Sequence, residues 1–146
     1  MGPDLMTPSA GPARPYRALA GTVRALAGTI ADIERVPDWP AQLRRHLDQL
    51  HLALDEHVHD TEGPDGSYTE TVIAAPRLAR AVSLLADDHR QLCGAVDALR
   101  RDLDAGTHPG DLRRCGAWLL VLLDRHRQRG IDLLYQAYGT DLGGET

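Results

Sequence analysis

The chain has 146 residues, enough for one domain around one hydrophobic core. Its hydrophobic content of 42% and charged content of 25% are those of an ordinary soluble globular protein, and because Phe is absent the core has to be built from Leu, Ala and Val. The net charge is −5 at pH 7 and no basic patch with interleaved aromatic residues occurs, which argues against nucleic acid as a partner.

The first half of the chain predicts an N-terminal arm and two helices. Residues 1–15 contain four prolines and two glycines, a composition typical of a disordered or extended segment. Apolar residues then recur every three or four positions over residues 16–35, which predicts a first helix. Prolines at positions 37 and 40 end it and start a second helix over residues 41–62, which the Gly-Pro-Asp-Gly sequence at 63–66 ends.

The second half predicts two longer helices. A loop with a short helical turn at residues 69–74 leads to a third helix over residues 76–105. The turn at 106–110 leads to a fourth helix over residues 111–138, which Gly139 can cap, and residues 140–146 form a short tail. Four helices joined by mostly short connections predict an all-α, up-down-up-down four-helix bundle spanning residues 16–139.

Three histidines interrupt otherwise aliphatic helix faces. His57 follows a run of leucines on the second helix, and His89 and His126 lie within the apolar faces of the third and fourth helices. At ~1.5 Å per residue, His89 and His126 both lie roughly 23 Å from the turn that joins their helices, and His57 has a similar depth. A single such histidine is most often an ordinary core residue with a hydrogen-bond partner, whereas three at one depth predict a shared metal site.

Nearby side chains are candidates to complete this site. Glu62 is the preferred fourth metal ligand, because the Gly-Pro sequence after it allows the helix end to unwind, and a solvated helix terminus is the alternative. Glu70, in the following loop, is a second candidate metal ligand. Cys93 lies one turn after His89 and is either a soft ligand or a small buried thiol.

Two further positions concern the space around the predicted metal. Gly130 lies one turn beyond His126, and its missing side chain opens room for a small substrate, dioxygen or the edge of a haem; close helix packing is the alternative. The first helix offers this layer no histidine, and at most the phenol of Tyr16. The loop at 63–71 is expected at the same end of the bundle and is a candidate lid.

Three segments resemble the hemerythrin-like (HHE) domain family. They are LDEHVHDTE at residues 54–62, LADDHRQL at 85–92 and LLDRHRQRGIDLLYQAY at 122–138. The resemblance covers the whole predicted bundle, and it implies a four-helix fold that holds two irons through His, Glu and Asp ligands. It also implies a role in binding dioxygen, sensing oxygen or nitric oxide, or storage and detoxification, and some related proteins are candidate enzymes.

The chain departs from the family pattern at the second ligand of each helix. Thr61 stands where the family has a glutamate, Cys93 where it has a second histidine, and Gly130 and Ile131 where it has a carboxylate. The first helix also lacks its expected histidine. We therefore expect fewer than two tightly bound irons, and a single Fe, Zn or Mn ion held by three imidazoles and one carboxylate fits what remains.

Three functions follow as hypotheses. The first is a non-haem metal protein, with iron foremost, that binds dioxygen, nitric oxide or peroxide; if it is an enzyme, it is an iron-dependent oxidoreductase whose catalytic residues stay unassigned. The second is a haem protein on the same bundle with one histidine as axial ligand. The third is a bundle without metal that acts as an interaction module.

Cysteine usage and hydropathy give the expected compartment. The two cysteines form no CxxC motif and no disulfide framework, and no charged flank followed by an apolar stretch marks a signal peptide. No apolar run approaches the length of a membrane span. The sequence therefore predicts a cytoplasmic protein that has a small-molecule ligand and no membrane partner, and it leaves the oligomeric state open.

Overall fold

The computed structural model describes the backbone of residues 14–139 and the side chains of residues 19–138. This part of the chain is helical and contains no β-strand. It has four long helices, which are α1 (Arg14–Ala31), α2 (Trp39–Glu62), α4 (Ala79–Asp104) and α5 (Pro109–Leu134). The short elements are α3 (Ser67–Ala74), the 3-10 turn η2 (Pro76–Leu78) and the π-helical turn η3 (Tyr135–Gly139).

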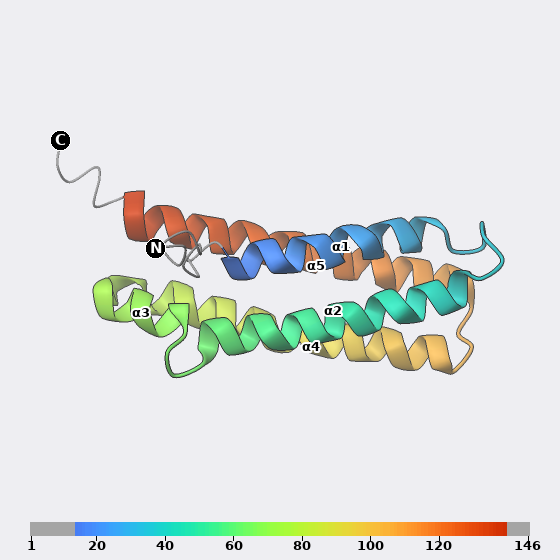
Figure 1. Cartoon of the computed structure of the whole chain (residues 1–146), viewed down its shortest axis with the longest axis horizontal. Helices are drawn as coiled ribbons and strands as arrows, with labels where there is room; N and C mark the ends of the chain where they lie inside the picture. The colour runs from blue at the N-terminus through green and yellow to red at the C-terminus, as the bar shows by residue number, and fades with distance from the viewer. Residues whose placement is uncertain (1–13, 140–146) are drawn as a thin grey trace, which may run out of the picture.

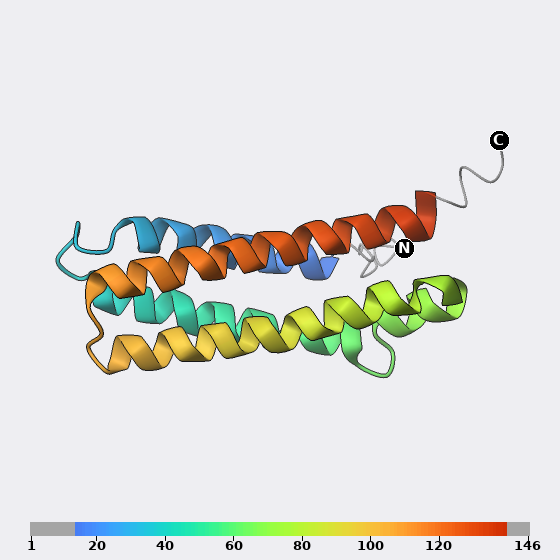
Figure 2. The same cartoon turned by 180° about the vertical axis from the view of Figure 1, so that it is seen from behind.

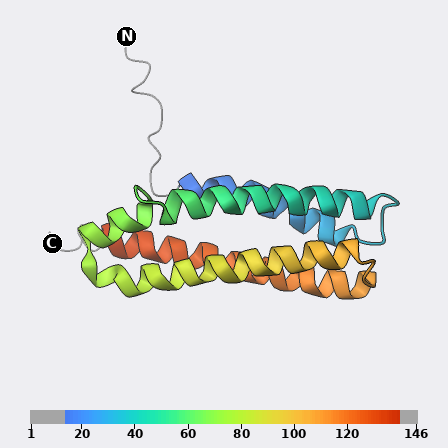
Figure 3. The same ribbon diagram turned by 90° about the horizontal axis from the view of Figure 1, so that it is seen from below.

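The long helices lie side by side along the long axis of the molecule (Figures 1 and 2). Each contacts two others, since α1 packs against α2 and α5, and α4 packs against α2 and α5. The α1–α2 and α4–α5 connections lie at one end, and α3 lies at the other end between α2 and α4, as the view from below also shows (Figure 3). Side chains on all four helices can therefore face one shared interior.

The interior consists of two apolar clusters with a polar layer between them. The larger cluster fills most of the bundle with leucines, isoleucines and Val96, many of which are fully buried. The smaller cluster, at the α3 end, contains Tyr68, Ala75, Leu78, Leu85 and Leu133. Along α2, α4 and α5 the three buried histidines lie at the edge of the larger cluster or between the two, so apolar side chains flank their layer and exclude water from it.

Shortening a core side chain should lower the stability of the bundle. Leu47 on α2 is 0% exposed and belongs to the larger cluster, so Leu47→Ala is expected to lower the free energy of unfolding by about 2–5 kcal/mol. Leu52, on the same helix, is 62% exposed, and Leu52→Ala is expected to change it by less than about 0.5 kcal/mol. Urea unfolding of the two variants measures both changes in the free energy of unfolding. Equal losses of stability would show that α2 does not bury the face that carries Leu47.

Three helix ends differ from the sequence expectation by three residues or more. The first helix ends at Ala31, followed by a turn in which Glu34 has a φ of 69°, a left-handed conformation that glycine would adopt more easily. Pro76 begins a 3-10 turn, so the α-helical part of the third helix starts only at Ala79. The α-helical part of the fourth ends at Leu134, and a π-helical turn replaces the predicted Gly139 cap.

Some expectations concern parts of the chain beyond the described residues. The tail at 140–146 lies outside them, as does the expected arm except for its last two residues, which belong to α1. The side chain of Tyr16 is also outside the described residues, so its predicted role stays a prediction. Among the described helices, none combines the length and the apolar character needed to cross a membrane.

Candidate metal centre

The rings of His57, His89 and His126 meet in the interior of the bundle. They come from α2, α4 and α5, and their exposed fractions are 2%, 2% and 1%. The Nε2 atom of His126 lies 3.0 Å from Nε2 of His57 and 3.2 Å from Nε2 of His89. The predicted convergence of these three histidines is thus confirmed, and they form a group of potential metal ligands whose donor atoms lie within 4.8 Å of one another.

Two of the three spacings between these nitrogens match those of donors on one shared ion. A Zn–N bond of about 2.0–2.1 Å in tetrahedral geometry places neighbouring donors about 3.3 Å apart, and slightly longer bonds at octahedral angles give a similar value. The two Nε2–Nε2 distances from His126 come close to this spacing. The rings also meet edge to face, with interplanar angles of 65° to 85°, so their nitrogens point inward from different directions.

Carboxylates occupy the outer nitrogens of two of the histidines. The Nδ1 atom of His89 lies 2.5 Å from Oε2 of Glu62, and Nδ1 of His126 lies 3.1 Å from Oδ2 of Asp88. A carboxylate accepts a hydrogen bond, so each Nδ1 carries the proton and each Nε2 keeps its lone pair for a metal. Asp88 is held in turn by Arg129, whose Nη1 lies 2.5 Å from Oδ1.

The position one turn after His57 on α2 is occupied by a threonine. Thr61 is fully buried one turn later, and its hydroxyl donates to the backbone carbonyl of His57 at 2.8 Å. This is the position at which the family pattern has a glutamate. Because the Thr61 hydroxyl is bonded to the helix backbone, it contributes to the packing of α2 and is not directed at the ring nitrogens.

A tyrosine outside the set of predicted ligands adjoins the histidines. Tyr68 on α3 is 5% exposed, and its hydroxyl lies 3.3 Å from Nε2 of His89. The two rings are stacked, with centroids 5.7 Å apart and planes 11° from parallel. Tyr68 lies in the loop that was predicted as a lid, but the eight-residue helix around it is too short for an apolar period to reveal its buried face.

Burial controls the charge of two of these histidines. Desolvation lowers the pKa of His89, and its hydrogen bond to Glu62 only partly opposes this shift. Desolvation likewise lowers the pKa of His126, with its hydrogen bond to Asp88 acting in the opposite direction. Both rings are therefore neutral near pH 7, which is the form that binds metal.

Acidification is expected to destabilise the metal-free protein. The folded state keeps His89 and His126 neutral, whereas in the unfolded chain they take up protons as the pH falls through the ordinary value of 6.5. His46, whose pKa is also lowered by burial, adds to the effect. Melting temperatures measured in chelator between about pH 7.5 and pH 5 should fall steadily. The slope should be smaller for His126→Gln, and melting that rises on acidification would contradict the assignment.

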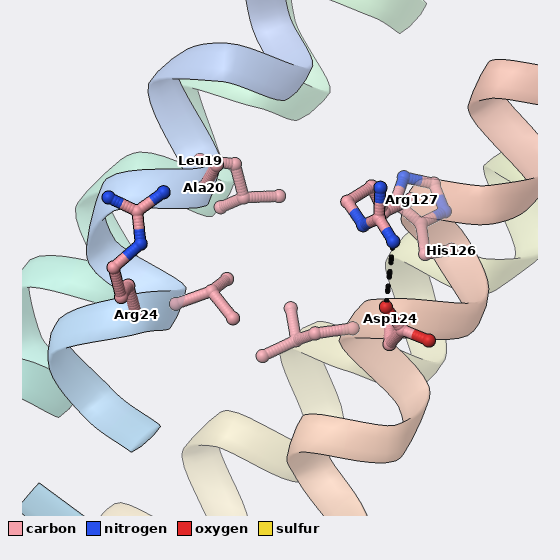
Figure 4. Close-up of a pocket in the computed structure, with 8 residues that line it drawn as sticks. Leu19, Ala20, Arg24, Asp124, His126 and Arg127 are labelled. Carbon is pink, nitrogen blue, oxygen red and sulfur yellow. Dashed lines mark hydrogen bonds and ion pairs between the residues drawn. The ribbon is translucent and has the colours of Figure 1, made fainter. Parts of the chain in front are cut away.

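A cavity between α1 and α5 reaches His126 from the side. Its volume is ≈360 Å³, and Figure 4 shows Arg24 of α1 on one side and His126 and Arg127 of α5 on the other. Arg127 is paired with Asp124 at 3.1 Å. The lining residues are Leu19, Ala20, Val23, Arg24, Leu123, Asp124, His126 and Arg127. The cavity therefore lies beside His126 and is lined by both apolar and charged side chains.

The other predicted ligands lie elsewhere. Glu62 contacts the outer nitrogen of His89, so in this arrangement it orients that ring and does not face the centre. Glu70 is exposed on α3 and is not part of the ligand group. Cys93 is half-buried outside this group, and burial raises the pKa of its thiol, which disfavours the thiolate that a metal requires. Gly130 is buried one turn after His126, and its role in making room stays a prediction.

Comparisons with protein-family models, with curated proteins and with solved structures gave no match for this chain. The resemblance to the hemerythrin-like family therefore stays a hypothesis, and the geometry of the histidine site is the feature that bears on function.

Proposed function

We propose that the protein is a hemerythrin-like metal-binding protein in which an up-down-up-down bundle holds one ion through His57, His89 and His126. The observation that supports this most directly is the convergence of three Nε2 atoms whose partner nitrogens, on two of the rings, are bonded to carboxylates. This is the arrangement by which proteins fix imidazole ligands. Three histidines suit iron or zinc, with manganese as a further candidate, and the family resemblance favours iron.

The proposed activity is the binding of a small molecule at the ion. Three protein ligands leave at least one coordination position, which is the condition for binding dioxygen, nitric oxide or peroxide. The chain itself supplies a water-poor site, because the rings are buried between two apolar clusters, and a cavity that lies beside His126. If the protein is an enzyme, we expect an iron-dependent oxidoreductase.

Metal analysis tests the proposal. Protein purified without a histidine tag, stripped with chelator and reloaded with Fe, Zn or Mn should bind one ion per chain. Its stability should rise by about 2.7 kcal/mol at a free metal concentration of 100 times Kd. Two irons with an oxo-bridged spectrum would contradict the expectation of a single ion. An intense Soret band would favour the haem-protein hypothesis. If the chain binds neither haem nor any of these metals, the hypothesis of a metal-free interaction module remains.

A further inference from the structure

We propose that Tyr68 is a fourth protein ligand of this metal, bound through its phenolate oxygen. The inference rests on the proposed metal-binding function and names a donor outside the histidines and carboxylates. Its starting point is the position of the Tyr68 hydroxyl, which lies 3.3 Å from Nε2 of His89. That is about the separation expected between neighbouring donors on one ion, and an ion with more than four positions keeps one for a small molecule.

The hydrogen bond between Tyr68 and His89 indicates how the oxygen would reach the metal. Because Glu62 holds the proton on Nδ1 of His89, the Nε2 atom is an acceptor and the Tyr68 hydroxyl donates to it. A metal on Nε2 takes the lone pair that this hydroxyl now uses. The metal then replaces the phenolic proton, which passes to solvent, and a metal–oxygen bond forms with no change of oxidation state.

The surroundings of Tyr68 favour direct coordination of the metal by its oxygen over a role as a hydrogen-bond partner of a ligand. The ring is 5% exposed and stacked on His89, so the oxygen is already held at the inward-facing nitrogen without a large loss of side-chain entropy. The nearby carboxylates of Glu62 and Asp88 are engaged on the outer nitrogens. Tyr68 is thus the oxygen donor that the structure places on the metal-facing side of the histidines.

This ligand would make metal binding close the α3 end of the bundle. The short helix α3 (Ser67–Ala74) contacts α2 and α4 and belongs to the connection between them. A bond from Tyr68 to the ion would tie this connection to α2, α4 and α5 at once. Amide hydrogen exchange in residues 67–74 should therefore slow on metal binding, and should slow much less in Tyr68→Phe.

Iron(III) loading of Tyr68→Phe tests the proposal, because a phenolate on iron(III) produces a visible charge-transfer band. The substitution removes only the oxygen and keeps the stacked ring. Tyr135→Phe, at a residue that is 73% exposed, is the matched control. We expect the band in the wild type and in Tyr135→Phe, and its loss in Tyr68→Phe at unchanged iron stoichiometry. A band that survives in Tyr68→Phe, or wild-type protein that binds iron(III) without one, would overturn the proposal.

Cobalt(II) titration covers the case in which the site excludes iron(III). We expect Tyr68→Phe to bind cobalt at least about tenfold more weakly than Tyr135→Phe and with a changed visible spectrum. Equal affinities and spectra would overturn the role of Tyr68 while leaving the three-histidine site intact. A wild-type protein that binds neither iron nor cobalt nor zinc would overturn both the metal site and this ligand.

Discussion

Replacing His126 with Ala is expected to weaken metal binding by more than about 100-fold. Loss of a residue that only orients a ligand weakens binding by at most about that much, and loss of the ligand itself should cost more. His126 has this large effect because its Nε2 atom is within hydrogen-bond distance of Nε2 on both other histidines. Without it, only two of the three imidazole ligands remain at the site. Competition titration with a coloured zinc chelator measures the loss, and circular dichroism in chelator checks that the variant folds.

His59→Ala is the matched control for this variant. His59 lies on α2 two residues after His57 and is exposed, so its removal changes the histidine count of the chain without touching the buried layer. We expect wild-type affinity from His59→Ala. Equal weakening in both variants would mean that the metal binds at surface histidines, and a folded His126→Ala with wild-type affinity would remove the central ligand from the site.

The three histidines could be predicted because their positions obey helix geometry. Each continues an apolar face with steps of three or four residues, and each lies at a similar distance from a turn that the Gly and Pro clusters mark. Both observations still hold when a helix start or end is misplaced by up to one turn. The shifted starts and ends of the helices therefore left the predicted convergence unchanged.

The partners of the histidines were harder to predict because they come from other helices. Asp88 precedes His89 by one residue and so lies on a different face of α4, where it contacts His126 of α5 across the interface. Glu62 was expected at the centre, but the end of α2 carries its carboxylate to the outer nitrogen of His89. Only the packing of α2, α4 and α5 shows which nitrogen of a ring each carboxylate meets.

Asp88→Asn is expected to weaken metal binding by about 10- to 100-fold, the range typical for loss of a partner that orients a histidine ligand. The Asp88 carboxylate accepts from Nδ1 of His126 and pairs with Arg129. An asparagine of the same shape can still accept one hydrogen bond, but it lacks the negative charge that makes Nε2 a stronger donor to the metal. The same titration of metal-stripped protein measures the effect.

The stability of the Asp88→Asn variant should change far less than its metal affinity. Arg129 has a side chain that is 44% exposed, so water can solvate its charge after the ion pair is lost. Asp87→Asn is the control, because Asp87 is an exposed neighbour that pairs with Arg90 in the same helix. Asp87→Asn should retain wild-type affinity. If both variants bind metal like the wild type, Asp88 contributes only to helix packing, and the charge on the outer nitrogen of His126 does not tune the site.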